Sequence, residues 1–208
     1  MGFRFLGDPI DLFIFKKAKR EGFKIIFQRK FWNKDDVLKT LSTLDYFCKQ
    51  NNVTADLVML GGSAILTLME INGESFRPTL DVDVNIINVS DMSIFAEQLK
   101  KVNVEIVGGV MEVPPMEDFE NQDFLYEVDA GFEAIRVYLP NIELLACSKI
   151  FSTREKDLYD LKDTKLLEKC DKEYLMSLVE EYKQYLLNPA NPDLNVHQLD
   201  RIFKEKGI

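Results

Sequence analysis

The chain has few of the residues that mark secreted, zinc-binding or membrane-spanning proteins. Its 208 residues include three cysteines, none in a Cys-x-x-Cys pair, which argues against a zinc site and against a disulfide framework. No apolar run approaches the roughly 20 residues that cross a bilayer. Asp8, Pro9 and Asp11 stand where a signal peptide needs an apolar stretch. We therefore expect a cytoplasmic protein with no membrane partner.

Two common phosphate-binding signatures are also missing. The sequence has no Gly-Lys-Ser or Gly-Lys-Thr of a P-loop and no Gly-x-Gly-x-x-Gly of a dinucleotide-binding fold. Basic residues are outnumbered, 26 against 35 acidic ones, and the net charge of −9 argues against coating of nucleic acid by the whole surface. Residues 16–34 differ, with eight basic side chains and one acid. This basic segment is either a solvated face or a contact for RNA or an acidic protein.

Hydrophobic patterning predicts an α+β fold. With 46% hydrophobic and 29% charged residues the composition is that of a globular protein. We expect residues 1–140 to form an α+β core with the basic N-terminal segment, and residues 141–208 to form a C-terminal helical region packed on this core. Strands are predicted at 55–60, 79–88, 102–113, 124–129 and 133–139. Helices are predicted at 8–21, 34–50, 64–71, 90–101, 141–152, 155–169, 172–187 and 196–206, and residues 23–32 form a strand or an amphipathic segment.

Asp81 and Asp83 are the most informative pair of residues. They stand two positions apart on a predicted strand, so both carboxylates project from one face. Such carboxylates repel each other unless a hard cation lies between them, and Mg²⁺ takes oxygen ligands of this kind together with substrate phosphates. The alternative is an ordinary edge strand that alternates apolar and polar residues.

A glycine turn precedes this pair by 18 positions. Gly61, Gly62 and Ser63 follow a buried strand and open a helix. Glycines let a phosphate approach the backbone, and the first turn of a helix offers unpaired N–H groups. Most turns of this kind only connect two elements. Together with the two aspartates, however, the turn predicts a site for a metal-bound triphosphate.

Three segments carry a family resemblance. LGGSAI at 60–65, RPTLDVDV at 77–84 and LLACSKIFSTREKDLYDL at 144–161 resemble the minimal nucleotidyltransferase, or polymerase-beta-like, superfamily. The last segment is similar to the helical pattern of AbiEii-like and related bacterial nucleotidyltransferases. The resemblance implies a mixed β-sheet flanked by helices. It also implies roles for individual residues: Gly61, Gly62, Ser63 and Lys149 contact the nucleotide, and Asp81 and Asp83 bind Mg²⁺ or Mn²⁺.

The resemblance further implies a third carboxylate, on a later strand, that acts as metal ligand and general base. Glu127 and Asp129 are the best candidates, since they lie two apart on one strand face. The supporting residues have two interpretations each. Arg77 and Thr79 position the aspartates or a phosphate, or they are an ordinary loop residue and an ordinary strand residue. Arg154 pairs with Asp157 or Asp160 and so braces the two halves of the chain, or it belongs to a solvated helix.

The expected function is transfer of a nucleoside monophosphate from a nucleoside triphosphate (NTP) to a hydroxyl. The acceptor is an RNA end (tRNA), a protein or a small molecule, and the resemblance includes toxins of type IV toxin–antitoxin systems, with a cognate antitoxin as partner. The alternative is a non-catalytic nucleotide-binding or protein-interaction module with the same fold. An antitoxin or immunity protein is a third possibility.

Overall fold

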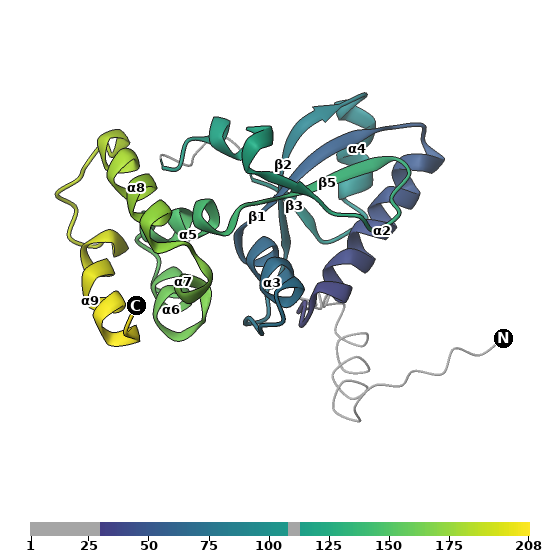
Figure 1. Ribbon diagram of the computed structural model, residues 1–208. Coiled ribbons are helices and arrows are strands. Elements are labelled where there is room, and N and C mark those ends of the chain that lie inside the picture. The colour runs from purple at the N-terminus through teal and green to yellow at the C-terminus, as the bar shows by residue number, and fades with distance from the viewer. Residues whose placement is uncertain (1–29, 108–112) are drawn as a thin grey trace, which may run out of the picture.

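The computed structural model describes residues 30–107 and 113–208 and confirms the predicted α+β class. A five-stranded mixed sheet is flanked by helices, and the elements after Pro140 are helical (Figure 1). The strands are β1 (Ala55–Leu60), β2 (Val82–Val89), β3 (Val104–Ile106), β4 (Leu125–Glu127) and β5 (Ile135–Pro140). The α-helices are α2 (Lys34–Gln50), α3 (Gly61–Ile71), α4 (Met92–Leu99), α5 (Ile142–Ile150), α6 (Glu155–Asp163), α7 (Leu166–Lys169), α8 (Lys172–Tyr182) and α9 (Leu199–Lys206). Short 3-10 helices are η1 (Met116–Phe119), η2 (Gln122–Phe124), η3 (Lys183–Tyr185) and η4 (Asn195–Gln198).

Strand β1 lies at the centre of the sheet, whose order is β3-β2-β1-β5-β4. It pairs antiparallel with β2 and parallel with β5. The edge strand β3 runs parallel to β2, and the other edge strand, β4, runs antiparallel to β5. All residues of β1 except Asp56 are buried, because its nearly continuous apolar sequence suits a strand covered on both faces.

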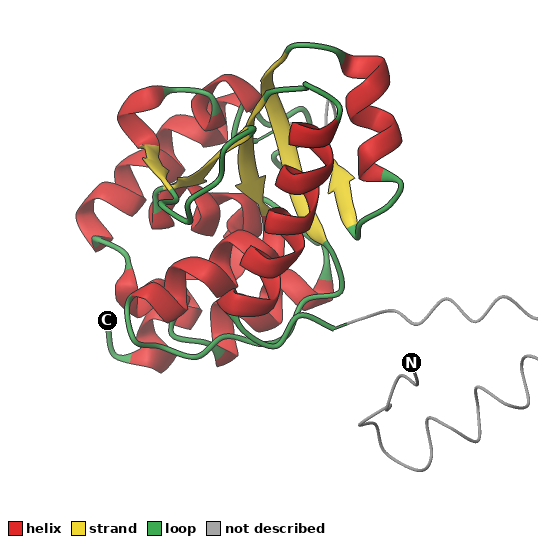
Figure 2. Cartoon of the chain, turned by 90° about the vertical axis from the view of Figure 1, so that its right-hand side faces the viewer, coloured by secondary structure: helices red, strands yellow, loops and turns green. Residues whose placement is uncertain are grey.

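Helix α2 begins and ends at the predicted capping residues. The Asn33 side chain accepts a hydrogen bond from the Asp36 N–H at 2.9 Å, and the helix ends at Asn51. Its buried residues are Val37, Leu41, Leu44 and Cys48, at the spacing of one helix face. Helix α2 packs on α3 and α4. Seen from the side of α2, helices lie in front of the strands (Figure 2).

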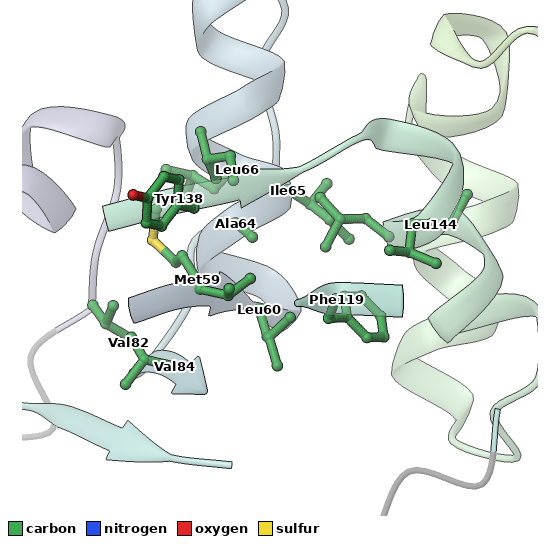
Figure 3. Packing of buried hydrophobic residues seen from close by; sticks show 14 of the residues in the cluster. Met59, Leu60, Ala64, Ile65, Leu66, Val82, Val84, Phe119, Tyr138 and Leu144 are labelled. Carbon is green, nitrogen blue, oxygen red and sulfur yellow. The ribbon is translucent and has the colours of Figure 1, made fainter. Parts of the chain in front are cut away.

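Helix α5 joins the sheet to the C-terminal helices. It packs against α3 on one side and against α6 and α8 on the other. Leu144 of α5 belongs to the same apolar cluster as Ile65 of α3 and Leu60 of β1 (Figure 3). One continuous core therefore extends from the sheet into the helices. None of the described helices is long and apolar enough to cross a membrane.

Several element boundaries differ from the predicted ones. The strand predicted at 102–113 is described only as the three-residue β3. The helix predicted at 155–169 is interrupted at Thr164, whose backbone is extended and whose hydroxyl donates to the Asp160 carbonyl at 2.5 Å. Helix α3 begins at Gly61, three residues earlier than predicted. The helix predicted at 8–21 and most of the segment at 23–32 lie outside the described residues.

Candidate metal and nucleotide site

Three carboxylates meet at one edge of the sheet. Asp83 lies near the start of β2, and Asp81 immediately precedes that strand. In the parallel register between β2 and β3, Asp83 is the partner of Glu105. Oxygen atoms of Asp81, Asp83 and Glu105 lie within 4.8 Å of one another. Three carboxylate oxygens at this spacing fit a hard divalent cation such as Mg²⁺ or Mn²⁺.

Asp83 is the member of this acidic cluster whose negative charge is disfavoured by its surroundings. Its burial, together with the negative charges of Asp81 and Glu105, raises the pKa of Asp83 to about 6. The positive charges of Lys156 and Lys149 act in the opposite direction but do not cancel the shift. A cation held by the cluster would relieve this repulsion.

The raised pKa of Asp83 predicts a pH-dependent cost in the metal-free protein. Folding favours the protonated carboxyl, so the cost is absent below about pH 4, where Asp83 is protonated in both the folded and the unfolded state, and it reaches its full size once the pH has risen above about 6. We expect Asp83→Asn to stabilise the metal-free protein by about 1–3 kcal/mol at pH 7.5 and by little at pH 4. Urea unfolding at both pH values measures this. A wild-type to variant difference that does not change with pH would contradict the expectation.

The glycine turn makes room for the acidic cluster. Gly61 has φ +59°, and a Cβ atom there would lie 2.3 Å from Asp83 Oδ2. A Cβ atom on Gly62 would lie 3.1 Å from Thr79 Oγ1. Both glycines therefore allow the start of β2 to lie directly against the start of α3. This packing role comes in addition to the phosphate contact predicted from the sequence.

Gly61→Ala is expected to disturb the acidic cluster, since the new methyl group would overlap the Asp83 carboxylate. We expect added Mg²⁺ to raise the thermal stability of the wild type, and we expect the variant to lose this stabilisation. Gly73→Ala is the matched control: Gly73 also has a positive φ, of +75°, but nothing lies within 4 Å of the position of its Cβ. Differential scanning fluorimetry with and without Mg²⁺ compares the two. Equal responses to Mg²⁺ would show that contact with Asp83 has no effect.

The Ser63 side chain makes a hydrogen bond inside the protein. The side chain is fully buried, and its hydroxyl donates to the Leu60 carbonyl at 3.0 Å. The hydroxyl thus satisfies a backbone group at the junction of β1 and α3. Its predicted contact with a phosphate stays a prediction.

Lys149 lies in a buried ionic network. Its side chain is only 2% exposed, and Nζ lies 2.5 Å from Asp157 Oδ1 and 3.4 Å from Asp160 Oδ2. Asp157 Oδ2 also accepts hydrogen bonds from Ser152 Oγ at 2.7 Å and Arg154 Nε at 2.6 Å. Burial would raise the pKa of Asp157, but Lys149 and the other donors hold it below its ordinary value. The network connects α5 to α6.

Arg77 attaches the loop before β2 to the same network. Its Nε and Nη2 donate to the two carboxylate oxygens of Asp160, at 2.5 Å and 2.7 Å. The hydrogen bonds to Asp160 raise the pKa of Arg77, so the guanidinium group stays positively charged. Two residues later, Thr79 Oγ1 donates to the Asp81 carbonyl at 3.3 Å. Thus α6 holds the chain that leads into the acidic cluster.

The structure does not bring Glu127 and Asp129 to this cluster. Glu127 lies on β4, three strand spacings from β2, or about 14 Å. Both residues contribute to a separate cavity of about 660 Å³, together with Lys34 and Lys169. Glu105 occupies the position beside Asp83 instead. The sequence places Glu105 inside a predicted strand but does not indicate which strand lies next to β2.

A cavity of about 820 Å³ opens beside the acidic cluster. Gly61 and Asp83 line it from the sheet, and Lys149 and Arg154 line it from the helices. The Arg154 side chain is 59% exposed. The cavity therefore presents one carboxylate of the acidic cluster, Asp83, and a cation for an anionic ligand in one space.

Comparison with known proteins agrees with this geometry. A family model described as a nucleotidyltransferase of unknown function (DUF6036) matches residues 39–206. The search of curated proteins found no match, and neither did the search of solved structures. The family match covers most of the chain and includes the glycine turn, the acidic cluster and the buried ionic network. The chain belongs to the nucleotidyltransferase family DUF6036.

Proposed function

We propose that this protein is a Mg²⁺- or Mn²⁺-dependent enzyme that transfers a nucleoside monophosphate from an NTP to a hydroxyl acceptor. The observation that carries the proposal is the meeting of Asp81, Asp83 and Glu105 oxygens within 4.8 Å of one another, beside the start of α3. A glycine in a left-handed conformation, Gly61, leaves the space that the Asp83 carboxylate of this cluster occupies.

Each group has a proposed task. Asp81, Asp83 and Glu105 hold the metal, which when bound neutralises charge on the phosphates. Backbone N–H groups in the first turn of α3 bind phosphate oxygens. Glu105 is the exposed member of the cluster, so it is the carboxylate that an incoming hydroxyl can reach. Its carboxylate oxygen takes the hydroxyl proton while the acceptor oxygen bonds to the α-phosphorus and the bond to the β-phosphate oxygen breaks, releasing pyrophosphate.

The acceptor and the biological role rest on the family resemblance. We propose an RNA end, such as that of tRNA, as the first acceptor to test, and a protein or small molecule as the others. Similarity to AbiEii-like toxins extends the proposal to a cytoplasmic toxin with a cognate antitoxin. The basic segment 16–34, proposed as an RNA contact, lies mostly outside the described residues.

A specific observation favours a second candidate, a nucleotide-binding module without turnover. Ser63 and Lys149 were both expected to contact the nucleotide. The Ser63 hydroxyl donates to Leu60, and Lys149 Nζ contacts Asp157 and Asp160. A ligand would have to compete with these partners, or be held by the metal and backbone alone. This arrangement is compatible with binding in the absence of efficient transfer.

One experiment separates the two candidates. The purified chain is incubated with each of four α-³²P-labelled NTPs, Mg²⁺ and total cellular RNA, and the Asp81→Ala/Asp83→Ala variant serves as control. Label that the wild type alone transfers to RNA or protein supports the enzyme and identifies the acceptor class. Metal-dependent NTP binding without transfer to any acceptor would favour the binding module.

A further inference from the structure

The cavity beside the acidic cluster extends far beyond it. From the sheet it is lined by Gly61 and Asp83, and at its other end by Leu186, Leu187 and Asn188, in the connection between η3 and η4. Figure 1 shows this connection on the outer side of the helical region, away from the sheet. One space therefore reaches from Asp83, one of the proposed metal ligands, to a loop about a hundred residues later in the chain.

The two ends of the cavity differ in chemistry. Asp83 lines the end at the sheet, and Lys149 and Arg154 line the cavity between its two ends. At the far end, Leu186 and Leu187 stand beside the amides of Asn188 and Asn191. An NTP has the same division: its triphosphate is charged, and its base has flat apolar faces with polar edges. Binding sites commonly combine an apolar lining with a few polar groups that fix orientation.

Leu187 is the most unusual residue at the far end, because its side chain is 82% exposed. Among the large apolar side chains of the described residues that are exposed, it has the highest exposed fraction. Among the lining residues, Ile106 is the other exposed large apolar residue; it is 44% exposed and belongs to the sheet, whereas Leu187 belongs to the far end. When a ligand covers an exposed leucine at the mouth of a cavity, the apolar surface removed from water contributes favourably to the free energy of binding.

The connection that carries Leu187 is fixed at both ends. Before it, the Tyr182 hydroxyl donates to Asp118 Oδ2 at 2.6 Å. After it, the buried Asn195 donates through Nδ2 to the Lys149 carbonyl and through its backbone N–H to the Ser152 carbonyl, both at 3.0 Å. The first bond joins α8 to η1, and the other two join the end of the connection to α5 and to Ser152, so the connection is held in place at both ends. A preformed site loses less free energy in ordering its side chains.

We propose that the connection Leu186–Asn191 binds the nucleoside end of the NTP. Leu187 packs against a face of the base, and the amides of Asn188 and Asn191 form hydrogen bonds with its edge. This inference rests on the proposed function, since it places the triphosphate at the acidic cluster. It also assigns the acceptor to the opposite side, where Glu105 is exposed.

The test compares two ligands by isothermal titration calorimetry of the full chain. With Mg²⁺ present, each of the four NTPs and inorganic tripolyphosphate are titrated into the wild type and Leu187→Ser. We expect the variant to bind its best NTP about tenfold more weakly and tripolyphosphate with unchanged affinity. Asn188→Ala should weaken NTP binding in the same selective way. Ile71→Ser is the matched control, because Ile71 is 58% exposed but contributes to the separate cavity beside Glu127.

The outcomes are distinct. Equal NTP affinity in the wild type, Leu187→Ser and Asn188→Ala would overturn the inference and leave the proposed function standing. The same holds if Leu187→Ser raises only the KM for the acceptor, because the far end would then bind the acceptor. A wild type that binds neither NTP nor tripolyphosphate with Mg²⁺ would overturn the proposed function itself, and the inference with it.

Discussion

Replacing Glu105 by glutamine is expected to lower nucleotide transfer by about 100-fold or more. The substitution keeps the size of the side chain but removes one of the three negative charges within 4.8 Å, together with the proposed proton acceptor. Loss of a general base costs on the order of 10²–10⁴ in rate. Steady-state transfer of α-³²P-labelled nucleotide, measured at saturating Mg²⁺, gives the ratio of rates. The effect should lie in kcat, because the first turn of α3 still binds the triphosphate and Asp81 and Asp83 still hold the metal.

Glu127→Gln is the matched control for Glu105→Gln. Glu127 is also an exposed glutamate on an edge strand, but it lies at the opposite edge of the sheet. We expect this variant to transfer nucleotide at the wild-type rate. Loss of activity in Glu127→Gln with full activity in Glu105→Gln would instead support the assignment of Glu127 made from the sequence. Circular dichroism of both variants verifies that each remains folded.

Asp157→Ala is expected to destabilise the protein by about 3–5 kcal/mol. Lys149 and Asp157 are both fully or almost fully buried and lie 2.5 Å apart, so removing the carboxylate leaves an ammonium group without its main partner. Two further donors, Ser152 and Arg154, lose the same acceptor. Urea unfolding followed by circular dichroism measures the loss. Asp157→Asn, which keeps the volume, provides the value if the alanine variant does not fold.

Arg154→Ala is the control for burial in this network. It removes an interaction with the same Asp157, but the arginine side chain is 59% exposed, so a loss below about 1 kcal/mol is expected. Comparable losses in Arg154→Ala and Asp157→Ala would contradict the argument that burial decides the cost. Replacing Lys149 and Asp157 together by methionine and leucine should recover much of the stability, because no buried charge is then left without a partner: Asp160 keeps its bonds from Arg77, and Arg154 is exposed.

The core elements were accessible from sequence because their signals are local. Asn33 caps α2 through a bond to a residue three positions away, and the apolar run of 55–60 specifies a buried strand wherever its neighbours lie. Asp81 and Asp83 were likewise recognisable, since alternation along one strand puts two residues two apart on the same face. The fold class and the resemblance to the nucleotidyltransferase superfamily follow from such local patterns.

The third carboxylate of the acidic cluster could not be predicted from local sequence patterns. Glu105 and Glu127 both stand in predicted strands, at 102–113 and 124–129. Only the strand order β3-β2-β1-β5-β4 puts Glu105 beside Asp83 and Glu127 three strands away. Strand order is set by how the whole set of helices and strands packs, and no spacing within either strand encodes it.

The sequence by itself determined the α+β class, the glycine turn, the two aspartates and the helical C-terminal part. Tertiary structure alone decided how these parts are used. It placed Gly61 against Asp83, directed the Ser63 hydroxyl to Leu60, and paired Lys149 with Asp157 and Asp160 inside the protein. The physical reason is range: caps, turns and strand faces depend on residues a few positions apart, whereas the pairing of buried charges and the order of strands depend on residues that only folding brings into contact.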